Sequence, residues 1–120
     1  MQKELELVKK FHKKFKVPVA KSPTLISKGR FDFRYKLMRD EVEEYLVDGI
    51  ESNKIENIAK ELADVLYAVY GTILEHGLQD KMEEIFLANH KSQMSKEYSK
   101  YKMKKGIKYF EVDIEKIIKN

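Results

Sequence analysis

Several residue types that support particular chemistries are absent from this sequence of 120 residues. Cysteine does not occur, which excludes disulfides, thiolate metal sites and a cysteine nucleophile. No stretch approaches the roughly 18 to 20 apolar residues that a membrane-spanning helix requires, and no N-terminal run resembles a signal peptide. We therefore expect a cytoplasmic protein without a membrane partner.

Proline is scarce, and both prolines, Pro18 and Pro23, fall in one short stretch. Each disfavours the α conformation in the residue before it and removes a backbone donor. We therefore expect a long loop that lasts to about Arg30.

The residues that are present favour a folded domain. Hydrophobic residues make up 42% of the chain and charged residues 37%, a composition too apolar for an intrinsically disordered protein. The length is typical of one compact domain, so we expect residues 1–120 to form a single domain.

Apolar residues recur at three- and four-residue spacing in four segments, which predicts four helices. Gly49 and Gly77 are expected to end the second and third helices, and Ser52 or Asn53, with Glu56 after it, to cap the third. From residue 106 the alternating pattern suits a short strand or extended arm before a last helical turn. The chain is predicted to be all-α and four-helix-bundle-like, with helices over about residues 3–16, 32–48, 53–76 and 79–96.

Two pairs of acids stand out on the second and third predicted helices. Glu41 and Glu44 are three residues apart, as are Glu61 and Asp64, so each pair projects from one side of its helix. An antiparallel hairpin brings the two pairs to nearly the same level. Because like charges repel at the edge of a core, this arrangement favours a divalent cation with oxygen ligands, magnesium or manganese.

Acids at this spacing also occur on ordinary solvated helix faces, where lysine or arginine accompanies them. Lys60 and Arg39 could play that part here. A di-iron four-helix protein would place carboxylates similarly, but it normally carries a Glu-x-x-His step, which this sequence lacks.

Residues 34–44 read RxxLxxDExxE, and ExxD follows sixteen residues later, at Glu61. This pattern resembles the MazG-like all-α nucleoside triphosphate pyrophosphatases. The runs IAKELADVLY at residues 58–67 and HKSQMSK at residues 90–96 are similar to a branch that resembles phosphoribosyl-ATP pyrophosphohydrolases. Two positions depart from the family pattern, Asp40 in place of glutamate and Gln93 in place of asparagine.

The resemblance implies a MazG-type fold, assembled as a homodimer or homotetramer, in which all four acids bind Mg²⁺, with Mn²⁺ as a substitute. The expected reaction is attack of water on the α-phosphorus of an NTP or dNTP, with Glu41 or Glu44 orienting or deprotonating the water. The expected products are the monophosphate and pyrophosphate. Residues expected to bind the substrate are Lys96, Asn89, Gln93 and Lys105.

Other functions remain open at this point. Phosphoribosyl-ATP hydrolysis in histidine biosynthesis is the alternative within the family. A non-enzymatic nucleic-acid binder would use the lysines and tyrosines of residues 91–109, but it leaves the acids unexplained, so we do not expect a nucleic-acid partner. His12 and Phe15 could stack on a base, although core packing is the more common role for such side chains.

Overall fold

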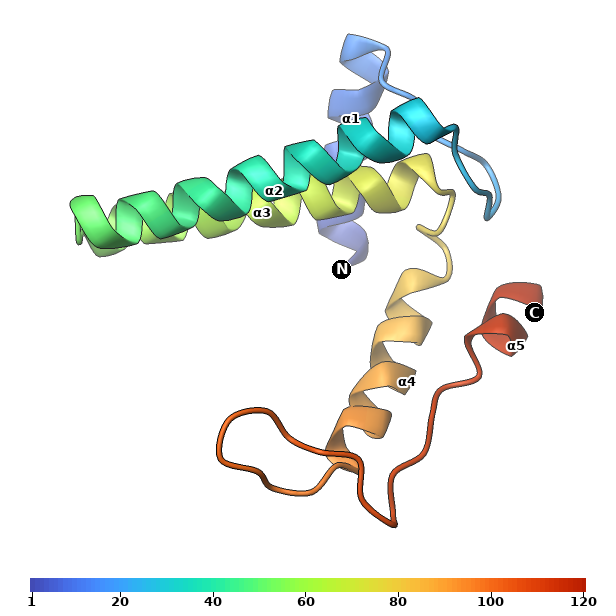
Figure 1. Ribbon diagram of the computed structural model, residues 1–120. Coiled ribbons are helices and arrows are strands. Elements are labelled where there is room, and N and C mark those ends of the chain that lie inside the picture. Colours follow the sequence, from blue (N-terminus) through green and yellow to red (C-terminus); the bar gives the residue numbers. More distant parts are fainter. The chain divides into compact units, whose positions relative to one another are not determined.

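The computed structural model describes residues 1–120 and contains five helices and no strand, which confirms the predicted all-α class. The chain divides into two compact units, residues 1–79 and residues 80–120, and each is described by itself. No helix is long and apolar enough to cross a membrane. The helices are α1 (Gln2–Phe15), α2 (Lys28–Glu51), α3 (Ile55–Glu75), α4 (Met82–Met94) and α5 (Ile114–Lys119) (Figure 1).

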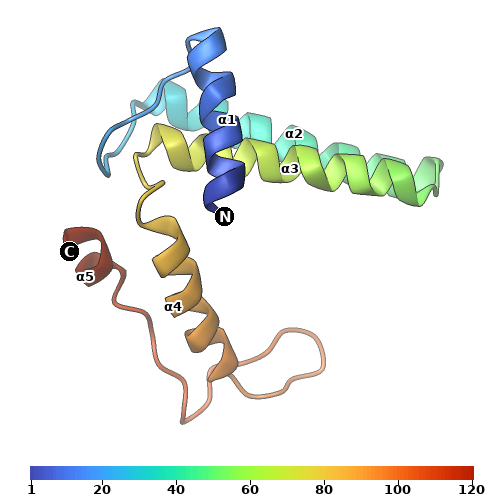
Figure 2. The same cartoon turned by 180° about the vertical axis from the view of Figure 1, so that it is seen from behind.

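The first unit consists of a long antiparallel pair, α2 and α3, crossed by α1 (Figures 1 and 2). α1 buries Leu5, Val8 and His12, one residue on each successive turn, against α3. It ends where Lys16 adopts the left-handed conformation, with φ of 57°. The predicted first helix is confirmed to within one residue at each end.

The second helix extends beyond its predicted end. We expected Gly49 to stop it, but α2 continues through Gly49 to Glu51, so that prediction is wrong. Packing on α3 offsets the low helix propensity of glycine, since a Cβ at Gly49 would lie in ordinary contact, 3.5 Å from Ile58. The turn instead uses Asn53, whose φ is 52°.

The predicted cap of the third helix is also wrong. Lys54 precedes α3 and makes no side-chain cap, because the neighbouring polar groups serve the turn. The Ser52 hydroxyl donates to the Asp48 carbonyl at 2.8 Å and accepts from Asn57 at 3.1 Å. At the other end the predicted stop is confirmed, with Gly77 in the left-handed conformation directly after the cap at His76.

The loop over residues 16–27 is tied to the C-terminal end of α3. The backbone of Ala20 donates to Leu74 at 3.0 Å, and that of Thr24 donates to His76 at 2.9 Å. A Cβ at Gly77 would lie 2.0 Å from the Ser22 carbonyl oxygen, so this close approach requires glycine. These bonds hold the loop across one end of the α2–α3 pair.

The second unit contains α4, a connecting segment and α5. Within α4 only Ile85 and Ser92 are buried. The Ser92 hydroxyl donates to the Phe110 carbonyl at 2.7 Å, which fastens the connecting segment to the helix. Residues 107–112 form no strand, so the extended arm, not the strand, follows from the alternating pattern. A single antiparallel bridge joins Glu97 and Lys104.

Candidate active site

Four carboxylates meet between the two long helices of the first unit. α2 supplies Glu41 and Glu44, and α3 supplies Glu61 and Asp64. One oxygen from each lies within 4.8 Å of the others. The antiparallel pairing of α2 and α3 produces this convergence because each acid pair spans about one helical turn.

Crowding of negative charge perturbs two of these acids. Burial, followed by hydrogen bonds with Asp48 and Glu44, raises the pKa of Glu61 to about 7. Burial, followed by the charges of Glu44 and Asp64, also raises the pKa of Glu41. A site that resists its own ionisation in this way is stabilised by a cation.

Lysine and arginine compensate the cluster only in part. Lys60 pairs with Asp64 at 2.5 Å from the exposed side. Arg39, the other cation considered from the sequence, pairs instead with Asp40 at 3.5 Å and Glu43 at 4.0 Å. One lysine therefore faces four acids.

The buried carboxylate oxygens test whether a divalent cation fits. Oε2 of Glu41 and Oε2 of Glu61 are both buried without a hydrogen-bond partner. Buried polar atoms are almost always satisfied, so these two oxygens indicate a missing positive ligand. Clustered carboxylate oxygens are the donors that magnesium and manganese prefer, and the residues present fit such a cation.

Asp48 is a fifth acid that the sequence analysis missed. Its carboxylate is the first hydrogen-bonding partner in the list of groups that raise the pKa of Glu61. It lies four residues after Glu44, a spacing that places both on one face of α2, and this signal was available in the sequence. Asp40, by contrast, is exposed.

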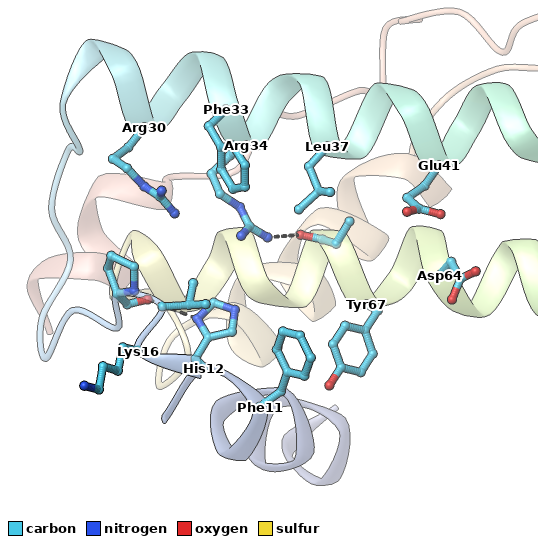
Figure 3. Close-up of a pocket in the computed structure, with 13 residues that line it drawn as sticks. Phe11, His12, Lys16, Arg30, Phe33, Arg34, Leu37, Glu41, Asp64 and Tyr67 are labelled. Atoms are coloured by element: carbon cyan, nitrogen blue, oxygen red, sulfur yellow. Dashed lines mark hydrogen bonds between the residues drawn. The ribbon is translucent and has the colours of Figure 1, made fainter. Parts of the chain in front are cut away.

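A cavity of about 450 Å³ borders the acidic cluster (Figure 3). Glu41 and Asp64 line one end of it. Its walls carry the aromatic rings of Phe11, Phe33 and Tyr67, with Phe11 and Tyr67 in edge-to-face contact at 5.4 Å. Ligand sites in proteins have this character, mostly apolar with a few polar groups at defined positions.

The opposite end of the cavity carries basic residues. Arg30 donates to Glu75 through two nitrogens, at 2.9 and 2.6 Å. Arg34 donates to Thr72 at 3.0 Å, to Glu75 at 3.1 Å and to the Ala68 carbonyl at 2.9 Å. The Glu75 side chain is completely buried, so both arginines are held on a fixed anchor. Arg30 and Glu75 were not identified from the sequence.

His12 lies beside this arginine network and is 2% exposed, which agrees with core packing. Its Nδ1 lies 3.0 Å from the Pro18 carbonyl, which only accepts, so Nδ1 carries the hydrogen. Burial, against the opposing effect of this hydrogen bond, lowers the pKa of His12. A Cβ at Gly71 would lie 2.9 Å from its Nε2 and 2.5 Å from Nη2 of Arg34, so the glycine makes room for both.

The residues expected to bind substrate belong to the second unit. Asn89 and Gln93 are exposed on α4, so the prediction that they lie on a buried stripe is wrong for the single chain. Lys96 is half-buried after the end of α4. Lys105 is exposed and pairs with Glu111 at 3.6 Å. Their roles stay predictions.

Comparison with known proteins identifies the family. The family model described as phosphoribosyl-ATP pyrophosphohydrolase matches residues 8–93, which include both acid pairs and the lining of the cavity. No curated protein matches the chain. The family is dependent on a divalent metal, in agreement with the acidic cluster. The chain therefore belongs to the phosphoribosyl-ATP pyrophosphohydrolase family and is a pyrophosphohydrolase of the MazG-like all-α superfamily.

Proposed function

We propose that the protein is a magnesium-dependent nucleoside triphosphate pyrophosphohydrolase, which converts an NTP or dNTP into the monophosphate and pyrophosphate. The observation that carries the proposal is the convergence of four carboxylates at the mouth of a cavity lined by aromatic rings. The carboxylates suit a metal-bound triphosphate, and the apolar cavity suits the nucleoside attached to it.

Glu41, Glu44, Glu61 and Asp64 would hold the divalent cation. When bound, such a cation supplies positive charge for the phosphate oxygens and lowers the pKa of water. The unpaired oxygens of Glu41 and Glu61 support this assignment, because both are buried and neither has another partner.

Glu41 or Glu44 would accept a proton from the attacking water. The new bond forms between the water oxygen and the α-phosphorus, and the bond from that phosphorus to the bridging oxygen breaks. The electron pair leaves with pyrophosphate, and the carboxylate keeps the proton. The raised pKa of Glu41 supports a basic role for it, since a general base works best with a pKa near the working pH.

Two predictions about the substrate belong to this proposal. The rings of Phe11, Phe33 and Tyr67 would contact the nucleoside. The second unit would contribute phosphate contacts through Lys96, which has no ion pair, and weaker contacts through Lys105, Asn89 and Gln93. A fixed ammonium group is a compact partner for a phosphate oxygen.

Phosphoribosyl-ATP is the second candidate substrate, and the match to the phosphoribosyl-ATP pyrophosphohydrolase family favours it. Both candidates are cut at the same kind of bond. The experiment is a screen of all NTPs, dNTPs and phosphoribosyl-ATP with Mg²⁺, in which released pyrophosphate is measured. Orthophosphate as first product, or full activity in EDTA, would exclude the proposed reaction.

The lysines after α4 distinguish an enzyme from a nucleic-acid binder. A bound triphosphate needs one or two fixed lysines, so Lys96→Ala should raise KM severalfold and Lys100→Ala should change it little. A polyanion track would recruit most of the lysines and release many counterions. Tight oligonucleotide binding that weakens with each substitution, at unchanged hydrolysis, would assign these lysines to a nucleic acid.

A homodimer or homotetramer is part of the proposal. Five apolar side chains on α2 and α3, each between 47% and 72% exposed, leave an apolar surface larger than a monomer normally shows. Light scattering at micromolar concentration should give at least twice the mass of the chain, and a strictly monomeric mass would contradict the assembly. These side chains are Val42, Leu46, Ile50, Leu62 and Leu66.

A further inference from the structure

The cavity has a charged group at each end, and only one end is explained by the proposed chemistry. Glu41 follows Arg30 by eleven residues on α2, which corresponds to about 16 Å along the helix. Both side chains line the cavity, and both turn toward α3 in Figure 3. A substrate whose triphosphate lies at Glu41 would point its other end toward Arg30.

Arg30 is held rigidly but keeps donors free. Its Nε and Nη2 bind Glu75, its guanidinium lies 4.6 Å from the centre of the Phe33 ring, and its Nη1 makes no hydrogen bond. The side chain is 35% exposed, whereas that of Arg34 is 5% exposed and has a partner for every nitrogen. Of the two arginines, Arg30 is therefore the one that can meet a ligand.

The charge at this end of the cavity selects the kind of group that would bind. Glu75 neutralises one of the two arginines, so the trio carries one net positive charge. Lys16 lines the same cavity and has no ion pair. Guanidinium and ammonium groups donate hydrogen bonds and cannot accept them. An acceptor oxygen is favoured here, and an amino group is disfavoured.

We propose that Arg30 is a specificity-determining residue. Through Nη1 it donates to an acceptor oxygen at the end of the substrate remote from the triphosphate. That oxygen belongs either to a carbonyl of the base or to a second phosphate group, and the chemistry of recognition is the same in both. Glu75 acts as a positioning residue that aims the guanidinium. This inference rests on the proposed function and refines its substrate.

The test measures kcat/KM of Arg30→Gln and Arg30→Lys on GTP, UTP, ATP, CTP and phosphoribosyl-ATP. A lost hydrogen bond to a charged donor should lower kcat/KM about 10- to 100-fold on substrates that carry the recognised oxygen, and much less on the others. Losses on GTP and UTP would identify a base carbonyl, and a loss on phosphoribosyl-ATP alone would identify the phosphate. Lys36→Gln, an exposed cation of α2 that does not line the cavity, is the matched control.

Other outcomes would overturn the inference. An equal loss on every substrate would show that Arg30 only supports the fold, and no loss would show that it does not touch the substrate. Arg30→Lys keeps a positive charge beside Glu75, so it provides the same comparison if Arg30→Gln unfolds. If the parent protein cleaves none of these substrates, the proposed function fails, whereas a substrate-independent loss in an active parent refutes only the role of Arg30.

Discussion

The two ends of the α2–α3 pair both gather charged side chains, but they do so in opposite ways. At one end Arg30 and Arg34 share the buried Glu75, and the hydrogen-bonding capacity of Glu75 and Arg34 is used within the protein. At the other end four acids face a single lysine, and two buried oxygens have no partner. The first arrangement is stable without a ligand, whereas the second is incomplete without one.

This contrast separates charges that support the fold from charges that serve function. Burying an ion pair is tolerable when hydrogen bonds replace the lost water, as they do around Glu75. Gathering like charges raises the free energy of the folded state, and such a cost is typical of functional sites. The predictions below break each end in turn, from the largest expected effect to the smallest.

Glu75→Ala should have the largest effect, and on stability. It leaves two arginines near the core without their shared partner, which costs about 3–5 kcal/mol for a broken buried pair. Urea denaturation should show this loss, while Glu6→Ala, an exposed acid on α1, should stay close to the parent. A loss for Glu75→Ala below about 1 kcal/mol would mean that water replaces Glu75.

Glu61→Gln should act on turnover and leave the fold intact. It removes one ligand from the acidic cluster, and kcat should fall about 100-fold or more, equivalent to about 2.7 kcal/mol. Stability without metal should be equal or higher, because carboxylate repulsion is relieved. The control is Glu56→Gln, an exposed acid in the first turn of α3. Near-normal turnover at saturating Mg²⁺ would refute the assignment of Glu61 as a ligand.

Gly71→Ala should destabilise the arginine end by overpacking. The new methyl group would lie 2.5 Å from Nη2 of Arg34, whose guanidinium is fixed by three hydrogen bonds, so about 1–3 kcal/mol should be lost. Gly49→Ala is the matched control, since its methyl group finds an ordinary contact and should stabilise the helix by about 0.5–1 kcal/mol. Melting temperatures that move in the same direction for both variants would contradict this account.

The smallest effect is expected in the pH dependence of stability at the acidic end. The pKa of Glu61 is raised to about 7, so in EDTA its contribution to stability is retained below about pH 4.5 and declines as the pH rises toward 7. His12 contributes with the opposite sign, because its pKa is lowered by burial. The difference between the parent and Glu61→Gln in urea denaturation isolates Glu61. Excess Mg²⁺ should remove the decline, and a decline that persists in Mg²⁺ would count against a metal site.

Sequence reasoning reached the acidic end of the molecule more completely than the arginine end. The two acid pairs are spaced by one turn on adjacent helices, so their meeting followed from local periodicity and a short hairpin. Glu75 lies forty-five residues from Arg30, and no local pattern connects them. It also stands directly after Ile73 and Leu74 in an apolar run, where an acid is uninformative until its partners are known.

The sequence by itself determined the helical class, the positions of most helices and the acids that gather, because these depend on residue spacing within one helix or across one turn. Only the tertiary structure decided which charges are compensated. Asp48 meets Glu61, Glu75 meets two arginines and the cavity connects the two ends, since each depends on the packing of α1 and α3 against other parts of the chain. The helix ends near Gly49 and Ser52 were decided in the same way, because packing against Ile58 and hydrogen bonds in the turn outweighed local propensity.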